Sequence, residues 1–132
     1  MIVHGAVILL IGLVAGLPYG QSIRTGVSEP RQRAWSAAHT GLTGTGVMLI
    51  ALGAVARGWG MDGQLGHATT LSLIASGYGF VFAMVLAACT GKRGLTAAMP
   101  IANLAVAAGY VFSVTTVLIG AGGFLVLAWE NT

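Results

Sequence analysis

Charged side chains are scarce in this sequence. Asp, Glu, Lys and Arg make up 7% of its 132 residues, whereas 56% of the residues are hydrophobic. Because soluble domains carry a charge on about a quarter of their residues, this composition indicates an integral membrane protein. Cysteine is scarcer still: Cys89 is the only one, which excludes an internal disulfide and a cysteine-based metal cluster. We expect Cys89 to be a buried structural thiol.

Several catalytic patterns are absent as well. The sequence contains no paired carboxylates, no Ser-His-Asp set and no HExxH motif. Gly41, Gly44 and Gly46 do not form a phosphate loop, because no strand precedes them and no Lys followed by Ser or Thr comes after them. Acid–base chemistry inside the bilayer would therefore have to use His, Tyr, Ser or Thr, or a metal-bound ligand.

The six Lys and Arg residues are confined to short connections between apolar runs. Basic residues in such positions set membrane orientation and contact lipid head groups, so the net charge of +3 does not point to a nucleic-acid partner. Five of the six lie in the connections at 20–33 and 90–98. The positive-inside rule predicts that these loops are cytoplasmic and that both termini lie outside, in what we expect to be a bacterial inner membrane.

Four apolar runs predict four transmembrane helices, at about 2–19, 34–56, 65–89 and 99–129. The first run is too long for a signal-peptide core and has no basic residues ahead of it, so we expect a retained helix. We expect this helix to end around Pro18, before a polar surface loop at 21–33. The chain is thus predicted to be one all-α membrane domain, residues 1–132, forming a four-helix transmembrane bundle.

Small residues recur at four-residue spacing in the last two runs. They are Ala75, Gly79, Ala83 and Ala87 in the third run and Ala105, Gly109 and Ser113 in the fourth. Such stripes let helix backbones approach closely. Four short helices enclose little volume, so a pocket of useful size forms more easily between subunits. We therefore predict a homo-oligomer.

His39 is the ionisable residue that should lie inside the membrane. It comes six residues after the polar segment ends at Arg33, or about 9 Å into the second helix. An ionisable side chain at that depth marks a ligand, a proton path or a paired contact. We expect His4 and His67 near the opposite membrane face, at the level of the lipid head groups. This placement favours a site with a single histidine.

One histidine cannot hold zinc, which needs three or four protein ligands. It can hold haem iron, because the porphyrin supplies four nitrogens and a proximal histidine is a common axial ligand. Trp35 and Thr43, four residues before and after His39, share its helix face and are candidate cofactor contacts. The alternative is that His39 only donates a hydrogen bond to a carbonyl of a neighbouring helix and so joins two helices.

Short motifs spread over nearly the whole chain resemble two related families. His4-Gly5, the segment 35–41 followed by Gly46 and 48–50, and 93–96 (Arg-Gly-Leu-Thr) resemble the styrene oxide isomerase family. Residues 29–31 leading to His39, the segment 82–88, and 99–102 (Met-Pro-Ile-Ala) resemble the hydroxylaminobenzene mutases.

The resemblance implies a four-helix membrane isomerase, a trimer with ferric haem b between subunits, and His39 as the axial iron ligand. Iron would act as a Lewis acid on the oxygen of a small aromatic substrate. An epoxide would become an aldehyde, or an aryl hydroxylamine an aminophenol, and neither reaction needs an oxidant or a reductant. The short chain and the Met-Pro-Ile-Ala run at 99–102 favour the mutase reaction.

Three positions depart from the family pattern. Thr45 stands where relatives tend to have Asn, and Ser76 and Met84 stand where the epoxide isomerases have Asp and Tyr. These departures weaken the epoxide reaction most and point toward the third possibility that the sequence leaves open, a haem-binding or structural membrane protein without catalysis. The candidate catalytic groups are Thr45, Ser76 and Tyr78.

Overall fold

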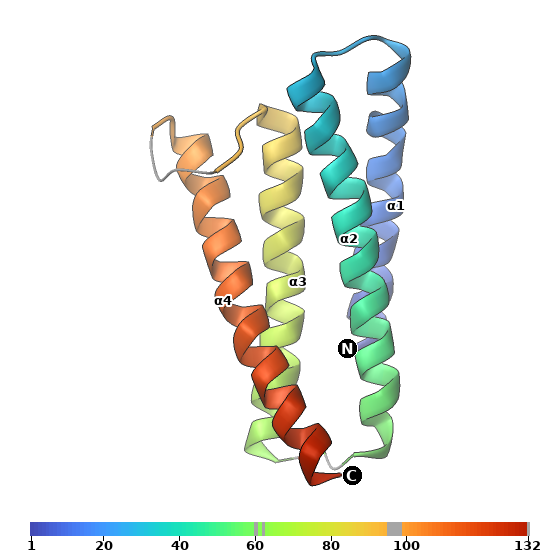
Figure 1. Cartoon of the computed structure of the whole chain (residues 1–132), viewed down its shortest axis with the longest axis vertical. Helices are drawn as coiled ribbons and strands as arrows, with labels where there is room; N and C mark the ends of the chain where they lie inside the picture. The colour runs from blue at the N-terminus through green and yellow to red at the C-terminus, as the bar shows by residue number, and fades with distance from the viewer. Residues whose placement is uncertain (60, 62, 95–98, 132) are drawn as a thin grey trace.

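The computed structural model describes residues 1–59, 61, 63–94 and 99–131. These residues form four long helices and one short 3₁₀ turn, and the described part of the chain contains no strand (Figure 1). The elements are α1 (Ile2–Arg24), α2 (Glu29–Val55), η1 (Ala56–Gly58), α3 (Gln64–Thr90) and α4 (Ile101–Glu130). All four helices are long and apolar enough to cross a membrane. The predicted all-α transmembrane fold is confirmed.

Two predicted boundaries are wrong. α1 does not end around Pro18 but continues to Arg24, and α2 begins at Glu29, so the connection is only four residues long. A proline removes one backbone hydrogen bond and bends a helix without having to end it. Pro30 lies in the first turn of α2, where its missing N–H would have no partner in the helix anyway. Arg33 donates a hydrogen bond to Glu29 one turn away, at 3.0 Å.

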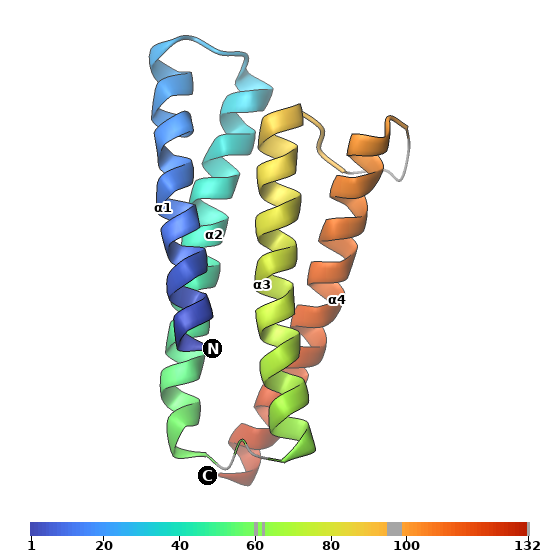
Figure 2. The same ribbon diagram turned by 180° about the vertical axis from the view of Figure 1, so that it is seen from behind.

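The helices form two antiparallel hairpins, α1/α2 and α3/α4, which meet mainly through α2 and α3 (Figures 1 and 2). Short connections make consecutive helices neighbours. In the described residues the backbone of α4 does not approach those of α1 or α2. The buried core lies where α1, α2 and α3 meet and consists of Ile8, Leu42, Leu49 and Leu73. The bundle is therefore closer to a row of helices than to a closed square.

Both hairpins are packed through small residues. A Cβ added to Gly46 would lie 2.5 Å from the backbone nitrogen of Leu9, so only glycine allows α1 and α2 to cross there. In the other hairpin, Gly79 faces Ser113, and a Cβ on Gly109 would lie 3.0 Å from that of Ala83. The predicted small-residue stripes thus do pack closely, but against each other within one chain. They give no support to the predicted oligomer.

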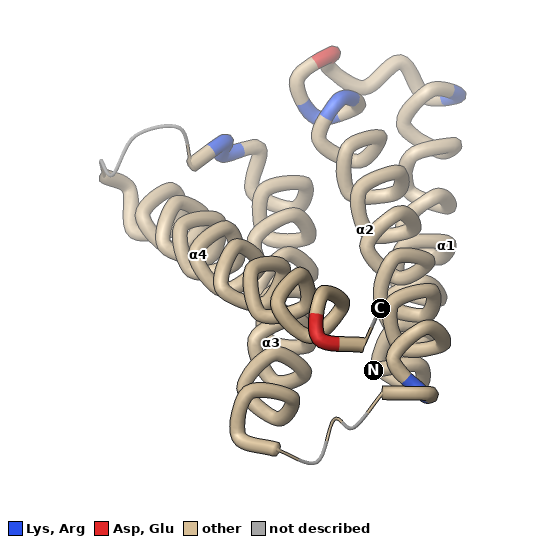
Figure 3. The backbone as a smooth tube through the Cα atoms, turned by 60° about the horizontal axis from the view of Figure 1, so that its bottom comes forward, with Lys and Arg blue, Asp and Glu red and all other residues tan. Residues whose placement is uncertain are grey.

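The basic residues gather where α1 and α3 end and α2 begins, and Arg57 in η1 lies at the opposite end with both termini (Figure 3). This distribution matches the count made from the sequence.

Cys89 is exposed, so the prediction of a buried thiol is wrong. It lies in the last turn of α3, on a face turned toward Ser28 and Pro30 and away from the buried Ala87 and Ala88.

Candidate functional site

His39 contacts α1 through a defined hydrogen bond. Its Nδ1 lies 2.9 Å from the carbonyl oxygen of Gly12. A carbonyl can only accept, so the proton is on Nδ1, and Nε2 of the neutral ring keeps a free lone pair. The side chain is half-buried. This is the helix-to-helix bond that the purely structural interpretation of His39 predicts, and it is also the bond that orients many metal-binding histidines.

Two further residues of α1 fix the position of the imidazole. A Cβ on Gly16 would lie 3.0 Å from Nδ1 and 3.1 Å from Cε1 of His39, so the absence of a side chain there makes room for the ring. The ring of Tyr19 stacks on the imidazole with centroids 6.4 Å apart and an interplanar angle of 22°. Gly12, Gly16 and Tyr19 follow the spacing i, i+4, i+7 and therefore lie on one face of α1.

Trp35, His39 and Thr43 share one face of α2, as the sequence predicts, and this face is turned toward α1. Trp35 lines a cavity of about 260 Å³ together with Pro18 and other residues. Thr43 packs against Gly12 and donates its hydroxyl to the carbonyl of His39 at 2.6 Å. The three residues thus come together against the neighbouring helix. The contact of Trp35 and Thr43 with a cofactor stays a prediction.

Thr45 and Ser76 lie apart from this face. Thr45 approaches Gly77 of α3, and its hydroxyl donates to the carbonyl of Gly41 at 2.9 Å. Ser76 is almost fully buried and donates to the carbonyl of Leu73 at 2.9 Å. Both hydroxyls are therefore engaged with their own helices. The predicted catalytic role of these two residues remains untested, and the structure does not bring them to the α1-facing side where His39 lies.

Tyr78 forms a contact that the sequence did not predict. Its hydroxyl lies 3.1 Å from Nδ1 of His4, and the two rings meet edge to face with centroids 5.8 Å apart. Tyr78 comes 14 residues after Gln64 and 12 before Thr90, near the middle of α3.

The contact with Tyr78 places the exposed side chain of His4 further along the bundle than its position near the start of α1 suggests. Its level at the lipid head groups stays a prediction. The reason for the contact is the offset between helices. The first residues of α1 pack beside Gly53, whose Cβ would lie 2.9 Å from Ile2 Cγ1, and α2 continues beyond that point into η1. His67 lies in the first turn of α3, at the helix end where we expected it. Its Nδ1 donates a hydrogen bond to the carbonyl oxygen of Gly63 at 3.0 Å.

The residues around His39 suit a metal centre that takes one protein ligand. In the described part of the chain, no three His, Cys, Asp or Glu residues gather closely enough to hold a metal ion among them. Haem needs only one protein ligand, because the porphyrin provides the equatorial nitrogens. The Nδ1–H of His39 is anchored on Gly12, and its Nε2 has no hydrogen bond in the described structure. These features fit a haem ligand.

Comparison with protein families gives one match. The family model described as styrene oxide isomerase covers residues 1–129. The chain belongs to the styrene oxide isomerase family. Neither the curated proteins nor the solved structures contain a significant match. Membership confirms the resemblance to the styrene oxide isomerase family. The four apolar helices make this family member a multi-pass membrane protein. The family name denotes an isomerase.

Proposed function

We propose that this member of the styrene oxide isomerase family is a haem-b-dependent membrane isomerase that rearranges an aryl epoxide to an aldehyde. The observation that carries the proposal is the family match along residues 1–129. It moves the epoxide ahead of the hydroxylamine that the sequence motifs alone favoured. The geometry of His39 supports the cofactor, because a ring held by one nitrogen presents the other in a fixed direction.

The residues of the chain would act mainly by positioning. Gly12 accepts from Nδ1–H of His39 and holds the tautomer whose Nε2 can bind iron, while Gly16 leaves room for the ring. Haem b, when bound, supplies a Lewis-acidic iron for the oxygen of the substrate. The apolar helices keep water away from an opened epoxide, which water would otherwise convert to a diol.

The reaction balances without a co-substrate. One C–O bond of the epoxide breaks, a hydride moves to the carbon that loses the oxygen, and the remaining C–O bond becomes a carbonyl. Substrate and product have the same atoms and the same electron count. We therefore expect conversion without NAD(P)H or added oxygen.

The second candidate reaction converts an aryl hydroxylamine to an aminophenol. It is favoured by the Met-Pro-Ile-Ala run at 99–102, which resembles the hydroxylaminobenzene mutases. In this reaction the oxygen moves from nitrogen to a ring carbon, again without net oxidation. The test is product analysis with both substrates on purified protein of known haem content. Haem-loaded protein that converts neither would favour a haem-binding or structural role without catalysis.

The role of His39 has a separate test, because both interpretations of this residue include the bond to Gly12. If the imidazole binds iron, His39→Ala should remove or strongly shift the Soret band. The protein should still insert, since the apolar helices drive insertion. His67→Ala and His4→Ala should leave the band nearly unchanged. An unchanged spectrum in His39→Ala would show that the residue only joins α1 and α2.

We also propose that haem lies between protomers of a homo-oligomer, a trimer by family resemblance. The supporting observation is that the half-buried His39 lies on the α1/α2 side of the row of helices, which α4 does not cover. A partly exposed imidazole facing lipid is costly, and a second copy covering it would remove that cost. Native mass spectrometry in mild detergent should show an oligomer carrying haem. A haem-loaded monomer would contradict the proposal.

A further inference from the structure

A basic cavity lies at the end of the bundle where α2 begins and α3 ends. Its volume is about 250 Å³. Arg33, Lys92 and Arg93 contribute the charged part of its lining, and the apolar part includes Ala37, Ala87 and the ring of Tyr110. α2 and α4 both line this cavity although their backbones do not pack against each other. The cavity thus combines positive charge with an apolar wall.

The segment that carries Lys92 and Arg93 is anchored on both sides. Gly91 closes α3 in the left-handed conformation, with φ of 70°, and its N–H donates to the carbonyl of Ala87 at 2.8 Å. Gly94, with φ of 63°, donates its N–H to the side-chain oxygen of Asn103 on α4 at 3.0 Å. Glycine adopts these angles without strain. The two basic residues are therefore held next to the cavity by backbone bonds.

The positive charge at the cavity is not balanced within the described chain. Arg33 pairs with Glu29, and both side chains are mostly exposed. No ion pair of Lys92 or Arg93 is formed among the described residues. Glu130, at the end of α4, lies at the far end of the bundle (Figure 3). Two cations therefore remain available for an external anion.

We infer that this cavity binds the phosphate head group of an anionic membrane lipid. Basic pockets between transmembrane helices attract such head groups, and each nearby Lys or Arg contributes. The apolar wall distinguishes a lipid from a free anion, because it favours a ligand whose charged group continues into hydrocarbon. The inference does not depend on haem or on catalysis, since none of the cavity residues belongs to the proposed site.

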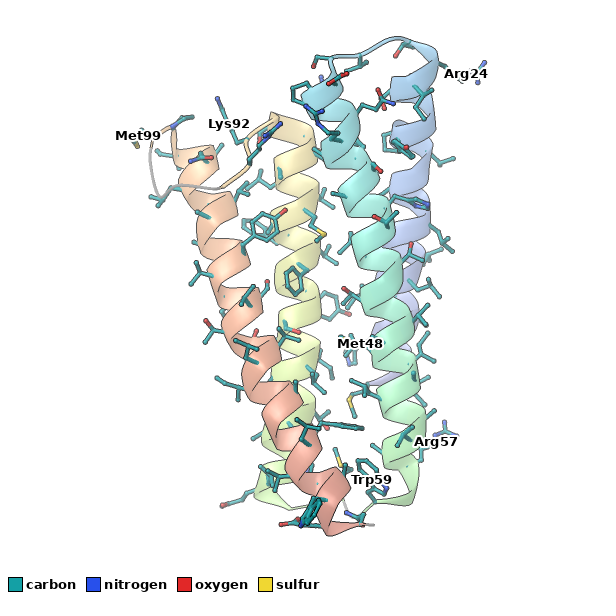
Figure 4. The ribbon with its side chains drawn as sticks, in the orientation of Figure 1. Arg24, Met48, Arg57, Trp59, Lys92 and Met99 are labelled. Carbon is teal, nitrogen blue, oxygen red and sulfur yellow. The ribbon has the colours of Figure 1, made fainter. Side chains whose placement is uncertain are left out.

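The test compares lipid binding by the full-length protein and matched variants. Delipidated protein in detergent is titrated with phosphatidylglycerol or phosphatidylcholine, and bound lipid is counted by native mass spectrometry. Wild type should prefer phosphatidylglycerol. Neutralising Lys92 and Arg93 together, as Lys92→Gln/Arg93→Gln, should lower its affinity about thirtyfold, or about fivefold for each charge. Arg24→Gln is the control. It removes one positive charge at the same end of the bundle but well away from Lys92 (Figure 4), so it should leave the affinity for phosphatidylglycerol unchanged.

A charge-conserving variant guards against misfolding. Lys92→Arg/Arg93→Lys should keep the preference for phosphatidylglycerol. A loss in Arg24→Gln that equals the loss per charge in the double Gln variant, about fivefold, would mean general surface attraction and overturn the inference. Binding of inorganic phosphate with the affinity of the lipid would replace it with a free-phosphate site. Loss of haem with retained lipid binding in the double Gln variant would assign the cavity to haem carboxylates and would also overturn it.

Discussion

Gly16 offers the most direct test of how α1 positions His39. Gly16→Ala would introduce a Cβ 3.0 Å from Nδ1 of the imidazole, so the ring must move by a few tenths of an ångström. The same Nδ1 forms the 2.9 Å bond to Gly12, so a shift of the ring alters this bond. Gly20→Ala, one turn further along α1, is a matched control because its Cβ would meet nothing within 4 Å.

The expected magnitude follows from two opposing terms. Replacing a helix-interior Gly with Ala stabilises the helix by about 0.5–1 kcal/mol, and this gain applies to both variants. A hydrogen bond between membrane helices contributes about 0.6 kcal/mol, and only Gly16→Ala loses it. Gly16→Ala should therefore be less stable than Gly20→Ala by about 0.6 kcal/mol. If Nε2 binds iron, haem affinity should also fall about threefold.

Two measurements give the result. Thermal unfolding in detergent compares the stability of the variants, and titration with haem followed at the Soret band compares their affinity. A difference in stability without a difference in haem affinity would mean that His39 only joins two helices. Identical behaviour of Gly16→Ala and Gly20→Ala in both measurements would refute the idea that Gly16 sets the position of the ring.

Three further predictions concern other parts of the bundle. Gly79→Leu should destabilise the protomer by about 1–3 kcal/mol through overpacking against Ser113. Gly122→Leu is the control and should not destabilise it, because the space around Gly122 is open. Equal melting temperatures of the two variants would contradict this packing. Tyr78→Phe should cost about 0.6 kcal/mol in thermal stability and leave the Soret band intact; loss of the band would place Tyr78 at the haem. Cys89 should react with a membrane-impermeant thiol reagent in inverted vesicles but not in intact cells, and the opposite result would reverse the predicted orientation.

The four helices could be predicted from the sequence because long apolar runs are needed to cross a membrane. Their ends could not. Hydropathy reports where the bilayer stops, whereas polar residues after Pro18 and before Ala34 still complete helical turns. The packing partners of the small-residue stripes could not be predicted either. The spacing shows that a helix face can pack closely, but it does not show which helix packs against it.

For the candidate site, the sequence singled out His39 but not its surroundings. His39 could be singled out because an ionisable group in an apolar helix has few structural explanations. Gly12, Gly16 and Tyr19 could not, since their meeting with His39 depends on the rotation and offset of two helices. The contact between His4 and Tyr78 depends on the same offset, which brings a histidine from the start of α1 beside the middle of α3.

The division into two hairpins has a consequence for biogenesis. Each hairpin contains its own tightly crossed helix pair, and α2 and α3 provide most of the contact between the hairpins. A cut in the connection between η1 and α3 would therefore remove no helix–helix contact. The halves, expressed as separate polypeptides, should each insert as a pair of helices and then associate in the bilayer. Association of the separate halves would show that assembly of this protein is a binding reaction between two preformed parts.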